Sequence, residues 1–336
     1  MGNRVREFMT HRDPDEHIWV ERDEEALIGT VRAGQRPMPR IRVFDLLQGE
    51  ANPGSPSQAL VWDGATLRIA AEQVNGKERG LTRAADYDLV FFQFSGSCAI
   101  ESEYGAIELE PGEVALIPAG IAHSSTGKGE CLRLRAMSKE AVNLGVDPDK
   151  PLTESRFKVV HSDPLPSQNG AGASTADGDR ALEHLSFWDP TSDIWIERRC
   201  SELVGCVKEG GRGLKKLRAF DYFTGMTGKG GARAPVLYTG NEFRIDVYNL
   251  EGQQRGFHRG LDEDEIWFQF RGHAVNDTEW GIIELDPGEM SYVPRGIAHR
   301  INGGKGFLRM VFYSRQLVHP KAFNSSAGRR TSFEVQ

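Results

Sequence analysis

Short hydrophobic runs alternate with polar turns along most of this chain. Residues rich in Val, Ile, Phe, Tyr and Trp form the runs 242–250 (EFRIDVYNL), 265–270 (EIWFQF), 281–285 (GIIEL), 290–294 (MSYVP) and 307–314 (FLRMVFYS). Runs of this kind, separated by Gly, Pro, Asp and Asn, are typical of β-strands joined by turns. Helical periodicity is scarce, and we expect short helices only at 21–31 (ERDEEALIGTV) and 138–145 (SKEAVNLG). The pattern predicts an all-β protein.

The chain contains an internal duplication. The segment IELEPGEVALIPAGIAH ends at His123 and IELDPGEMSYVPRGIAH ends at His299, which is an offset of 176 residues, the difference between 123 and 299. The same offset aligns 91–96 (FFQFSG) with 267–272 (WFQFRG) and 42–49 (RVFDLLQG) with 218–225 (RAFDYFTG). One ungapped shift relates 13–139 to 189–315, so a whole domain is repeated. Two such all-β copies predict two tandem jelly-roll barrels.

A polar segment separates the two copies. Residues 161–181 (HSDPLPSQNGAGASTADGDRA) have the composition of a linker or a long exposed loop. We therefore place an N-terminal domain at 1–145, a linker at 146–185 and a C-terminal domain at 186–336. The polar tail from Asn324 onward is expected to fray.

Composition and charge exclude several classes of function. The net charge is −7 with both signs spread along the chain, which is unlike a nucleic-acid-binding protein. The sequence has no apolar run of about 18 residues, and its first residues are too polar for a signal peptide. The four cysteines, Cys98, Cys131, Cys200 and Cys206, form no CxxC pair, which favours a reducing cytoplasmic location. A homodimer formed through exposed strand edges is a further expectation.

Candidate metal ligands gather in the second copy. Glu265 begins the strand-like run 265–270, and with a period of two residues it faces the same way as Trp267 and Gln269. His258 precedes it by seven residues, within reach if the loop between them turns back. His299 follows a Pro-Gly turn that ends another strand-like run. One Glu and two His are enough to hold a divalent metal on one face and leave coordination positions open.

The first copy serves as an internal control for this assignment. It keeps His123 at the position of His299, but it has Thr82 and Leu89 at the positions of His258 and Glu265. One imidazole alone does not hold a metal tightly, so we expect the first copy to lack a metal site. Asp262 and Asp264 recur in the first copy as Asp86 and Asp88 and are expected to be structural turn residues. Glu263, which Tyr87 replaces, stays an alternative ligand.

These motifs resemble those of the cupin superfamily, which read G-x5-H-x-H-x3,4-E-x6-G and G-x5-P-x-G-x2-H-x3-N. In this chain, Glu265-x6-Gly272 is similar to the end of the first motif, and His258 stands at its first His, while Gly260 replaces its second. The second motif is matched by the residues of the later strand and turn, namely Gly288, Pro294, Gly296 and His299, with Asn302 one residue early. The resemblance implies a bicupin, two cupin barrels of the double-stranded β-helix type.

The resemblance also suggests a reaction. A metal site of two His and one Glu is similar to that of aromatic ring-cleaving cupins such as homogentisate and 3-hydroxyanthranilate dioxygenases. It implies a non-haem Fe(II)-dependent dioxygenase whose partners are O2 and a small hydroxylated aromatic substrate carrying a carboxylate. The candidate substrate-binding residues, chosen for their types and their places on the strands, are Arg244, Trp267, Gln269, Tyr292 and Arg309.

Two alternatives stay open. The same ligands could serve a cupin isomerase, lyase or hydrolase that uses Zn, Mn or Ni in place of iron. A non-enzymatic bicupin that binds a small molecule is the second alternative. Arg244 and Arg309 recur in the first copy as Arg68 and Arg133, which favours structural ion pairs at these positions.

Overall fold

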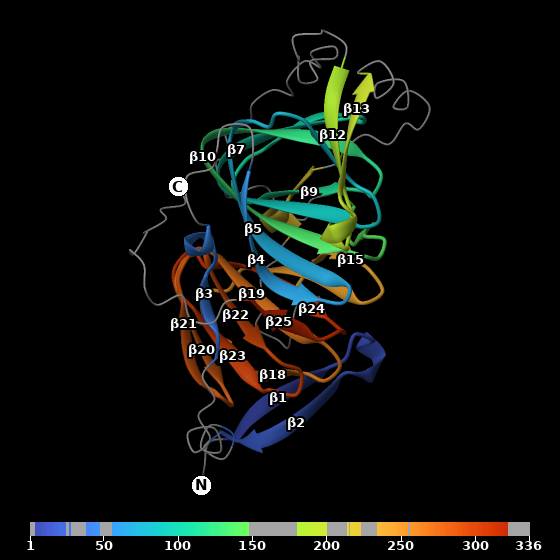
Figure 1. Cartoon of the computed structure of the whole chain (residues 1–336). Coiled ribbons are helices and arrows are strands. Elements are labelled where there is room, and N and C mark those ends of the chain that lie inside the picture. Colours follow the sequence, from blue (N-terminus) through green and yellow to red (C-terminus); the bar gives the residue numbers. More distant parts are fainter. Residues whose placement is uncertain are drawn as a thin grey trace.

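The computed structural model describes residues 4–24, 27, 38–47, 56–147, 180–199, 214, 216–222, 234–254 and 256–321. Most of the expected linker, Cys200, Cys206 and the C-terminal tail lie outside these ranges. Strands dominate the described part of the chain and form two barrels, which lie one above the other in the view of Figure 1. Within these ranges we find no helix with the length and apolar character that crossing a membrane requires.

The C-terminal barrel consists of two seven-stranded sheets that face each other. In order, the first sheet, sheet A, contains β2 (Ile18–Asp23), β1 (Arg4–Thr10), β18 (Phe257–Gly260), β23 (His299–Gly303), β20 (Ala274–Thr278) and β21 (Gly281–Leu285), with β17 (Gly252–Gln253) on β23. The second, sheet B, contains β11 (Asn143–Leu144), β15 (Val236–Thr239), β16 (Phe243–Tyr248), β24 (Leu308–Ser314), β19 (Asp264–Arg271), β22 (Glu289–Val293) and β3 (Arg40–Arg42).

The N-terminal barrel is one eleven-stranded sheet that is continuous because two of its strands are long. Its main path is β13 (Ile194–Arg199), β12 (Arg180–Ser186), β6 (Leu81–Ala84), β10 (Ala122–Ser138), β5 (Leu67–Lys77), β4 (Ser57–Gly64) and β25 (Val318–Pro320). The others are β7 (Asp88–Ser102), β8 (Gly105–Leu109), β9 (Glu113–Ile117) and β14 (Lys216–Arg218). In the described part of the chain, short 3-10 helices lie between strands at Pro14–Glu16, Val43–Leu46, Pro190–Ser192 and Ala219–Tyr222.

The two copies exchange their N-terminal segments. The hairpin β1–β2 at the start of the chain pairs in parallel with β18 of the C-terminal barrel, so that Phe8 lies opposite His258. The hairpin β12–β13, which begins the second copy, pairs in the equivalent register with β6 of the N-terminal barrel. The next segments exchange as well, because β3 pairs with β22 and β14 pairs with β9. In Figure 1 the blue hairpin accordingly lies against the orange barrel and the yellow-green hairpin against the green one.

The boundaries 1–145, 146–185 and 186–336 stay a prediction about the chain, and each barrel in space is completed by a segment of the other copy. A hairpin with an amphipathic face can cover either of two equivalent barrels, so its position is set by chain length and connection geometry. The sequence repeat carries no information on that choice.

An aromatic core joins the two barrels. The faces of β7 and β19 that point away from the barrel cavities pack on each other, with Phe92 5.3 Å from Phe270 and Phe94 5.6 Å from Phe268 between ring centroids. Phe44, on the exchanged segment, stacks on Phe94 at 4.8 Å. These rings are almost fully buried. Aromatic pairs in these geometries add to the burial of apolar surface, so the contact between the barrels is a stable one.

The strand alternation expected at 265–270 is confirmed. Ile266, Phe268 and Phe270 belong to the core between the barrels. Glu265 and Trp267 face the cavity of the C-terminal barrel. The helix expected at 138–145 was wrong: this segment ends β10 and contains β11, because Asn143 and Leu144 pair with β15. Of the helix expected at 21–31, residues 21–23 belong to β2, Glu24 and Leu27 are helical, and the remaining residues lie outside the described ranges.

Candidate metal centre

The three expected ligands come from three strands on two sheets. His258 is on β18 and His299 is on β23 of sheet A, where the two residues lie opposite each other. Glu265 is on β19 of sheet B and reaches across the barrel. Gly296 has a φ of 84°, a backbone conformation that favours glycine, and its N–H donates to the carbonyl of Gly260. This turn places His299 at the start of its strand.

The three side chains form a triangle in which one ligand atom from each lies within 4.8 Å of the others, and each imidazole faces a different oxygen of Glu265. Nδ1 of His258 lies 3.2 Å from Nε2 of His299 and 3.3 Å from Oε1 of Glu265. Nε2 of His299 lies 3.4 Å from Oε2 of Glu265. Ligands bound to one ion at about 2.1 Å are separated by about 3.0 Å in an octahedron and about 3.4 Å in a tetrahedron. The three side chains therefore lie close enough together to bind one face of a divalent metal ion.

The other nitrogen of each imidazole is held in place. Nε2 of His258 is 2.6 Å from the hydroxyl of Thr10, and Nδ1 of His299 is 3.2 Å from the carbonyl of Ile297. Such contacts fix the ring and its tautomer, and they are typical of metal-binding histidines. The indole N–H of Trp267 donates to Oε2 of Glu265 at 2.9 Å.

The electrostatics suit a cation. Burial lowers the pKa of His258 to about 4, so its lone pair is free to coordinate at neutral pH. Burial alone would raise the pKa of Glu265, but His299, His258 and the hydrogen bond from Trp267 hold it at about 2. Oε1 of Glu265 is buried and accepts no hydrogen bond from the described residues. A buried carboxylate oxygen without a donor is costly, and a bound cation would satisfy it. The residues present thus fit a divalent metal.

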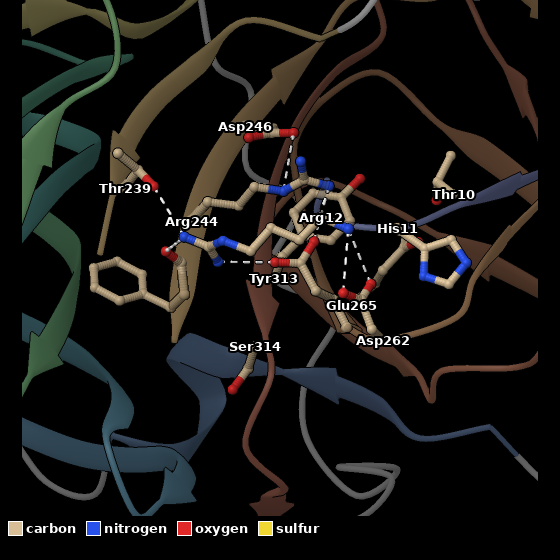
Figure 2. A network of polar contacts seen from close by, with 12 residues as sticks. Thr10, His11, Arg12, Thr239, Arg244, Asp246, Asp262, Glu265, Tyr313 and Ser314 are labelled. Atoms are coloured by element: carbon tan, nitrogen blue, oxygen red, sulfur yellow. Dashed lines mark hydrogen bonds and ion pairs between the residues drawn. The ribbon is translucent and has the colours of Figure 1, made fainter. Parts of the chain in front are cut away.

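A cavity of about 410 Å³ opens on the free side of the triangle. Its wall opposite the imidazoles carries Arg244, Asp246, Tyr248 and Tyr313. The guanidinium of Arg244 lies 4.1 Å above the Tyr313 ring, and its Nε lies 3.8 Å from Asp246 (Figure 2). Burial raises the pKa of Asp246 to about 7. The hydroxyls of Tyr248 and Tyr313 are 2.5 Å apart.

The exchanged hairpin supplies part of this cavity. Phe8, Thr10, Arg12 and His17 line it. The Arg12 side chain donates to Glu263 at 2.9 Å and to Thr239 at 3.1 Å, and the Arg12 backbone N–H donates to Asp262 (Figure 2). Sequence reasoning missed these four residues. The match of 18–22 to 194–198 shows that the hairpin is repeated, but no sequence signal places the first hairpin on the second barrel.

The acids of the loop before β19 have separate roles. Asp262 and Glu263 hold Arg12, and Glu263 also pairs with Arg244 at 3.1 Å. Asp264 accepts hydrogen bonds from the Tyr292 hydroxyl and from Arg295. Of the four consecutive acids at 262–265, therefore, only Glu265 lies beside the imidazoles of His258 and His299.

The five candidate substrate-binding residues divide into two groups. Arg244 and Trp267 line the cavity. Arg309 lies behind Trp267 and donates to Gln269 and Asn276, while Gln269 donates to the carbonyl of Arg271. Tyr292 packs against Trp62 in the contact between the barrels. We therefore assign Gln269, Tyr292 and Arg309 to the packing of the barrel, because buried polar side chains of this kind satisfy one another and the backbone.

The N-terminal barrel lacks this triangle. His123 is buried, and burial lowers its pKa to about 4. Leu89 packs in an apolar cluster at the position equivalent to Glu265. Over the described ranges, the three residues of the C-terminal barrel are the one group of His, Cys, Asp and Glu side chains spaced to hold a metal. Cys98 and Cys131 are buried free thiols.

Comparisons with known proteins are distant. No protein-family model matches the chain. A 78-residue segment is 27% identical to a protein of Saccharolobus solfataricus named "Putative dioxygenase", and the match spans 23% of this chain and 20% of that protein. The chain thus spans about a fifth of the length of the curated relative that it matches.

Several solved structures are similar at low identity. A cupin 2 conserved barrel domain protein from Leptotrichia buccalis is 9% identical, with a TM-score of 0.48 over 82% of this chain and 95% of that one. Oxalate decarboxylase from Bacillus subtilis is 10% identical, with a TM-score of 0.41 over 86% and 80%. A nickel(II) complex of a bacterial pirin from Escherichia coli is 10% identical, with a TM-score of 0.44 over 83% and 99%. The fold predicted from the sequence, two tandem all-β barrels, is confirmed by the strand arrangement described above.

Proposed function

We propose that this protein is a non-haem Fe(II)-dependent dioxygenase that cleaves a small hydroxylated aromatic substrate carrying a carboxylate. The observation that carries the proposal is the triangle of two imidazoles and one carboxylate at the inner end of a cavity. Three ligands on one face leave adjacent positions free, an arrangement typical of non-haem Fe(II) oxygenases. Bound Fe(II) would supply positions at which a substrate hydroxyl and O2 meet.

The residues around the triangle hold it in a geometry ready for a metal. Thr10 and the carbonyl of Ile297 fix the outer nitrogens of His258 and His299. Trp267 holds one oxygen of Glu265 and leaves the other free. Little reorganisation is needed on binding, which favours both affinity and a defined orientation of the open positions.

The opposite wall is suited to an anionic ring. Arg244 is mostly buried, and its Nε has no acceptor among the described residues. A substrate carboxylate could accept from this N–H and from the neighbouring Nη2, which forms an ion pair with Glu263. Phe8 and Trp267 provide apolar walls for a flat ring. The cavity volume of about 410 Å³ lies within the range of about 300–1,000 Å³ that small-ligand sites occupy.

Asp246 is the group best placed to exchange a proton with the substrate. It lies in the cavity wall beside Arg244, and burial raises its pKa to about 7, near the pH at which a proton donor and acceptor is most effective. The first copy has Ala70 at the equivalent position, so this carboxyl accompanies the metal ligands in the second copy.

The proton-transfer groups of the cavity also favour a second candidate function, a metal-dependent isomerase or lyase using Zn, Mn or Ni. Such reactions move protons without consuming O2, and Asp246 with the Tyr248–Tyr313 hydroxyl pair offers proton-transfer groups in the cavity. The two candidates differ in a simple way: the second retains its activity without oxygen.

The test is oxygen consumption by protein that has been reconstituted anaerobically with Fe(II). A panel of catechols, gentisates and aminophenols is offered to the wild type, to His258→Ala and to Glu265→Ala. We expect uptake with at least one substrate for the wild type and none for either variant. His273→Ala is the matched control, because this histidine is half-exposed and pairs with Asp286 away from the cavity. Iron-loaded wild-type protein that consumes no oxygen with any of the compounds would refute the dioxygenase proposal.

A further inference from the structure

The N-terminal barrel has a cavity of its own, of about 540 Å³, at the position equivalent to the metal cavity. Thr82, Phe91 and His123 line it at the positions of His258, Trp267 and His299, an offset of 176 residues. The exchanged hairpin β12–β13 closes it from the same side as β1–β2 closes the other. The duplication has thus kept the cavity while the metal ligands differ.

Arg135 and Glu72 enter this cavity at positions that are neutral in the other barrel, as does Glu78 at the position of Gln254. Arg135 occupies the position of Val311, and Glu72 occupies that of Tyr248. The side chains of Arg135 and Glu72 are both more than nine-tenths buried. Charged side chains are almost never buried this completely unless they are paired, so their partners show what the cavity is built to hold.

Glu72 is already satisfied. Its Oε2 accepts a short hydrogen bond from Nε of Arg133, and its Oε1 accepts from the Gln58 amide at 2.7 Å. Arg133 completes its own contacts with Cys98 Sγ at 3.2 Å and Ser125 Oγ at 2.9 Å. The buried pair of Glu72 and Arg133 is therefore neutral as a unit.

Arg135 is a buried cation whose hydrogen bonds go to neutral groups. Its Nη1 donates to the neutral Gln58 at 3.2 Å and lies 3.9 Å from Oε1 of Glu72, and its Nη2 donates to the Tyr87 hydroxyl at 2.9 Å. Its Nε is buried and has no acceptor among the described residues. The guanidinium thus keeps its positive charge beside one distant carboxylate that two other groups already occupy.

Of the other charged groups of the cavity, Arg79 is exposed, and the rest make contacts of their own. Asp193 lies 3.2 Å from His184, and Glu78 accepts the backbone N–H of Ser125 at 2.9 Å. Arg68 pairs with Asp63 at 2.9 Å and lies 4.2 Å above the Trp188 ring. Among the described residues, the carboxylate paired with Arg135 is thus that of Glu72 at 3.9 Å, which Arg133 and Gln58 also contact, while Glu78 attracts Arg135 from farther away.

We propose that the N-terminal barrel is a metal-independent binding site for a small aromatic carboxylate, whose anionic group pairs with Arg135. A carboxylate matches the planar fork of a guanidinium and would accept from its unused Nε–H. The aromatic side chains of Phe91, Tyr87 and Trp188 line the same space and suit a flat ring. The inference goes beyond the proposed reaction and does not depend on the metal centre.

The experiment is isothermal titration of metal-free protein with benzoate. The background is the Arg244→Val variant, in which the guanidinium facing the other cavity is absent. We expect one benzoate per chain, and at least tenfold weaker binding when Arg135→Val is added, which converts the position to the residue of the other barrel. Benzyl alcohol, which has the ring without the charge, should bind at least tenfold more weakly than benzoate.

Absence of benzoate binding in the Arg244→Val background would overturn the proposal, as would binding that is unchanged by Arg135→Val. Thermal stability supplies a second readout. If Arg135 were a structural partner of Glu72, Arg135→Val would lower the Tm of the ligand-free protein. A binding role predicts an equal or higher Tm without benzoate and the loss of the stabilisation that benzoate gives. Arg135→Met, which preserves more of the side-chain length, repeats the comparison if the valine variant does not fold.

Discussion

Glu263 and Glu265 allow a sharp test of the metal centre, because both are buried acids of one short segment with different partners. Glu265 lies between His258 and His299, whereas Glu263 pairs with Arg12 at 2.9 Å and Arg244 at 3.1 Å. We expect Glu265→Gln to abolish stoichiometric metal binding and Glu263→Gln to preserve it. The free energy of unfolding of the metal-free protein should show the opposite order, because Glu263→Gln should lower it more than Glu265→Gln.

The magnitudes follow from these contacts. Glu263→Gln leaves two mostly buried guanidinium groups short of a counterion, and breaking a buried pair costs about 3–5 kcal/mol. Because the Arg12 and Arg244 side chains each retain 20% exposure, we expect a value near the lower end of that range, about 3 kcal/mol. Glu265→Gln keeps an acceptor for Trp267 and removes an unsatisfied anionic oxygen. The metal-free stability should then change by no more than about 1 kcal/mol.

Metal binding should also raise the melting temperature, Tm, of a protein that keeps the ligands. A ligand at 100 times its dissociation constant stabilises the folded state by about 2.7 kcal/mol. At roughly 2 °C per kcal/mol for a chain of this size, saturation with metal should raise the Tm of the wild type by about 5 °C. Differential scanning calorimetry with and without Co(II), together with metal content per chain, measures both effects. Equal metal content in the two variants would refute the assignment of Glu265 as a ligand.

Three further results are expected. Burial raises the pKa of Asp246 to about 7. Between about pH 4 and 7 the folded state therefore keeps a proton that the unfolded chain has lost. The contribution of Asp246 to the free energy of unfolding should then fall by up to about 1.4 kcal/mol per pH unit over this range. Urea titrations of the wild type and of Asp246→Asn across this range should differ by that contribution, and identical pH profiles would contradict it. Thr10→Val should weaken metal binding about 10–100-fold in a chelator competition, because it frees the ligand imidazole 2.6 Å away; unchanged affinity would contradict this role. Combining Thr82→His, Leu89→Glu and Arg135→Val should raise the metal content from one to two per chain by elemental analysis, and a content that stays at one would show that more than the ligands differs.

The sequence predicted the barrels and the ligand triangle because both depend on local pattern. The period of two residues along 265–270 separates Glu265 and Trp267 from Phe268 and Phe270, and the structure places the two sets on opposite faces. The repeat supplied the comparison that distinguishes fold residues from ligands. His123, for example, shows that this histidine position is occupied in both copies.

The cavity wall could not be predicted, because it depends on which segment covers which barrel. Thr10 and Arg12 are about 250 residues from the strands they contact, with separations of 248 to His258 and 251 to Glu263. Arg309 and Gln269 have residue types suited to a ligand, yet they bond to each other in the barrel wall. Strand alternation gives the face on which a side chain lies. It does not show whether neighbouring polar groups in the barrel wall form hydrogen bonds with that side chain before it reaches the cavity.

The exchange of hairpins makes each cavity depend on both copies. Thr10 of the first copy steadies His258 in one barrel, and Ser186 of the second copy contacts the Tyr87 hydroxyl at 2.8 Å in the other. Tyr87 in turn accepts from Arg135, so a carboxylate bound to Arg135 would lie close to a hairpin contributed by the second copy. Divergence after duplication was therefore free to alter the inner positions of each barrel, as at Val311 and Arg135, but not to separate the barrels. The chain that forms the hairpin on one barrel continues into the strands of the other barrel. A ligand that orders this hairpin therefore acts on a segment that is covalently joined to the other cavity.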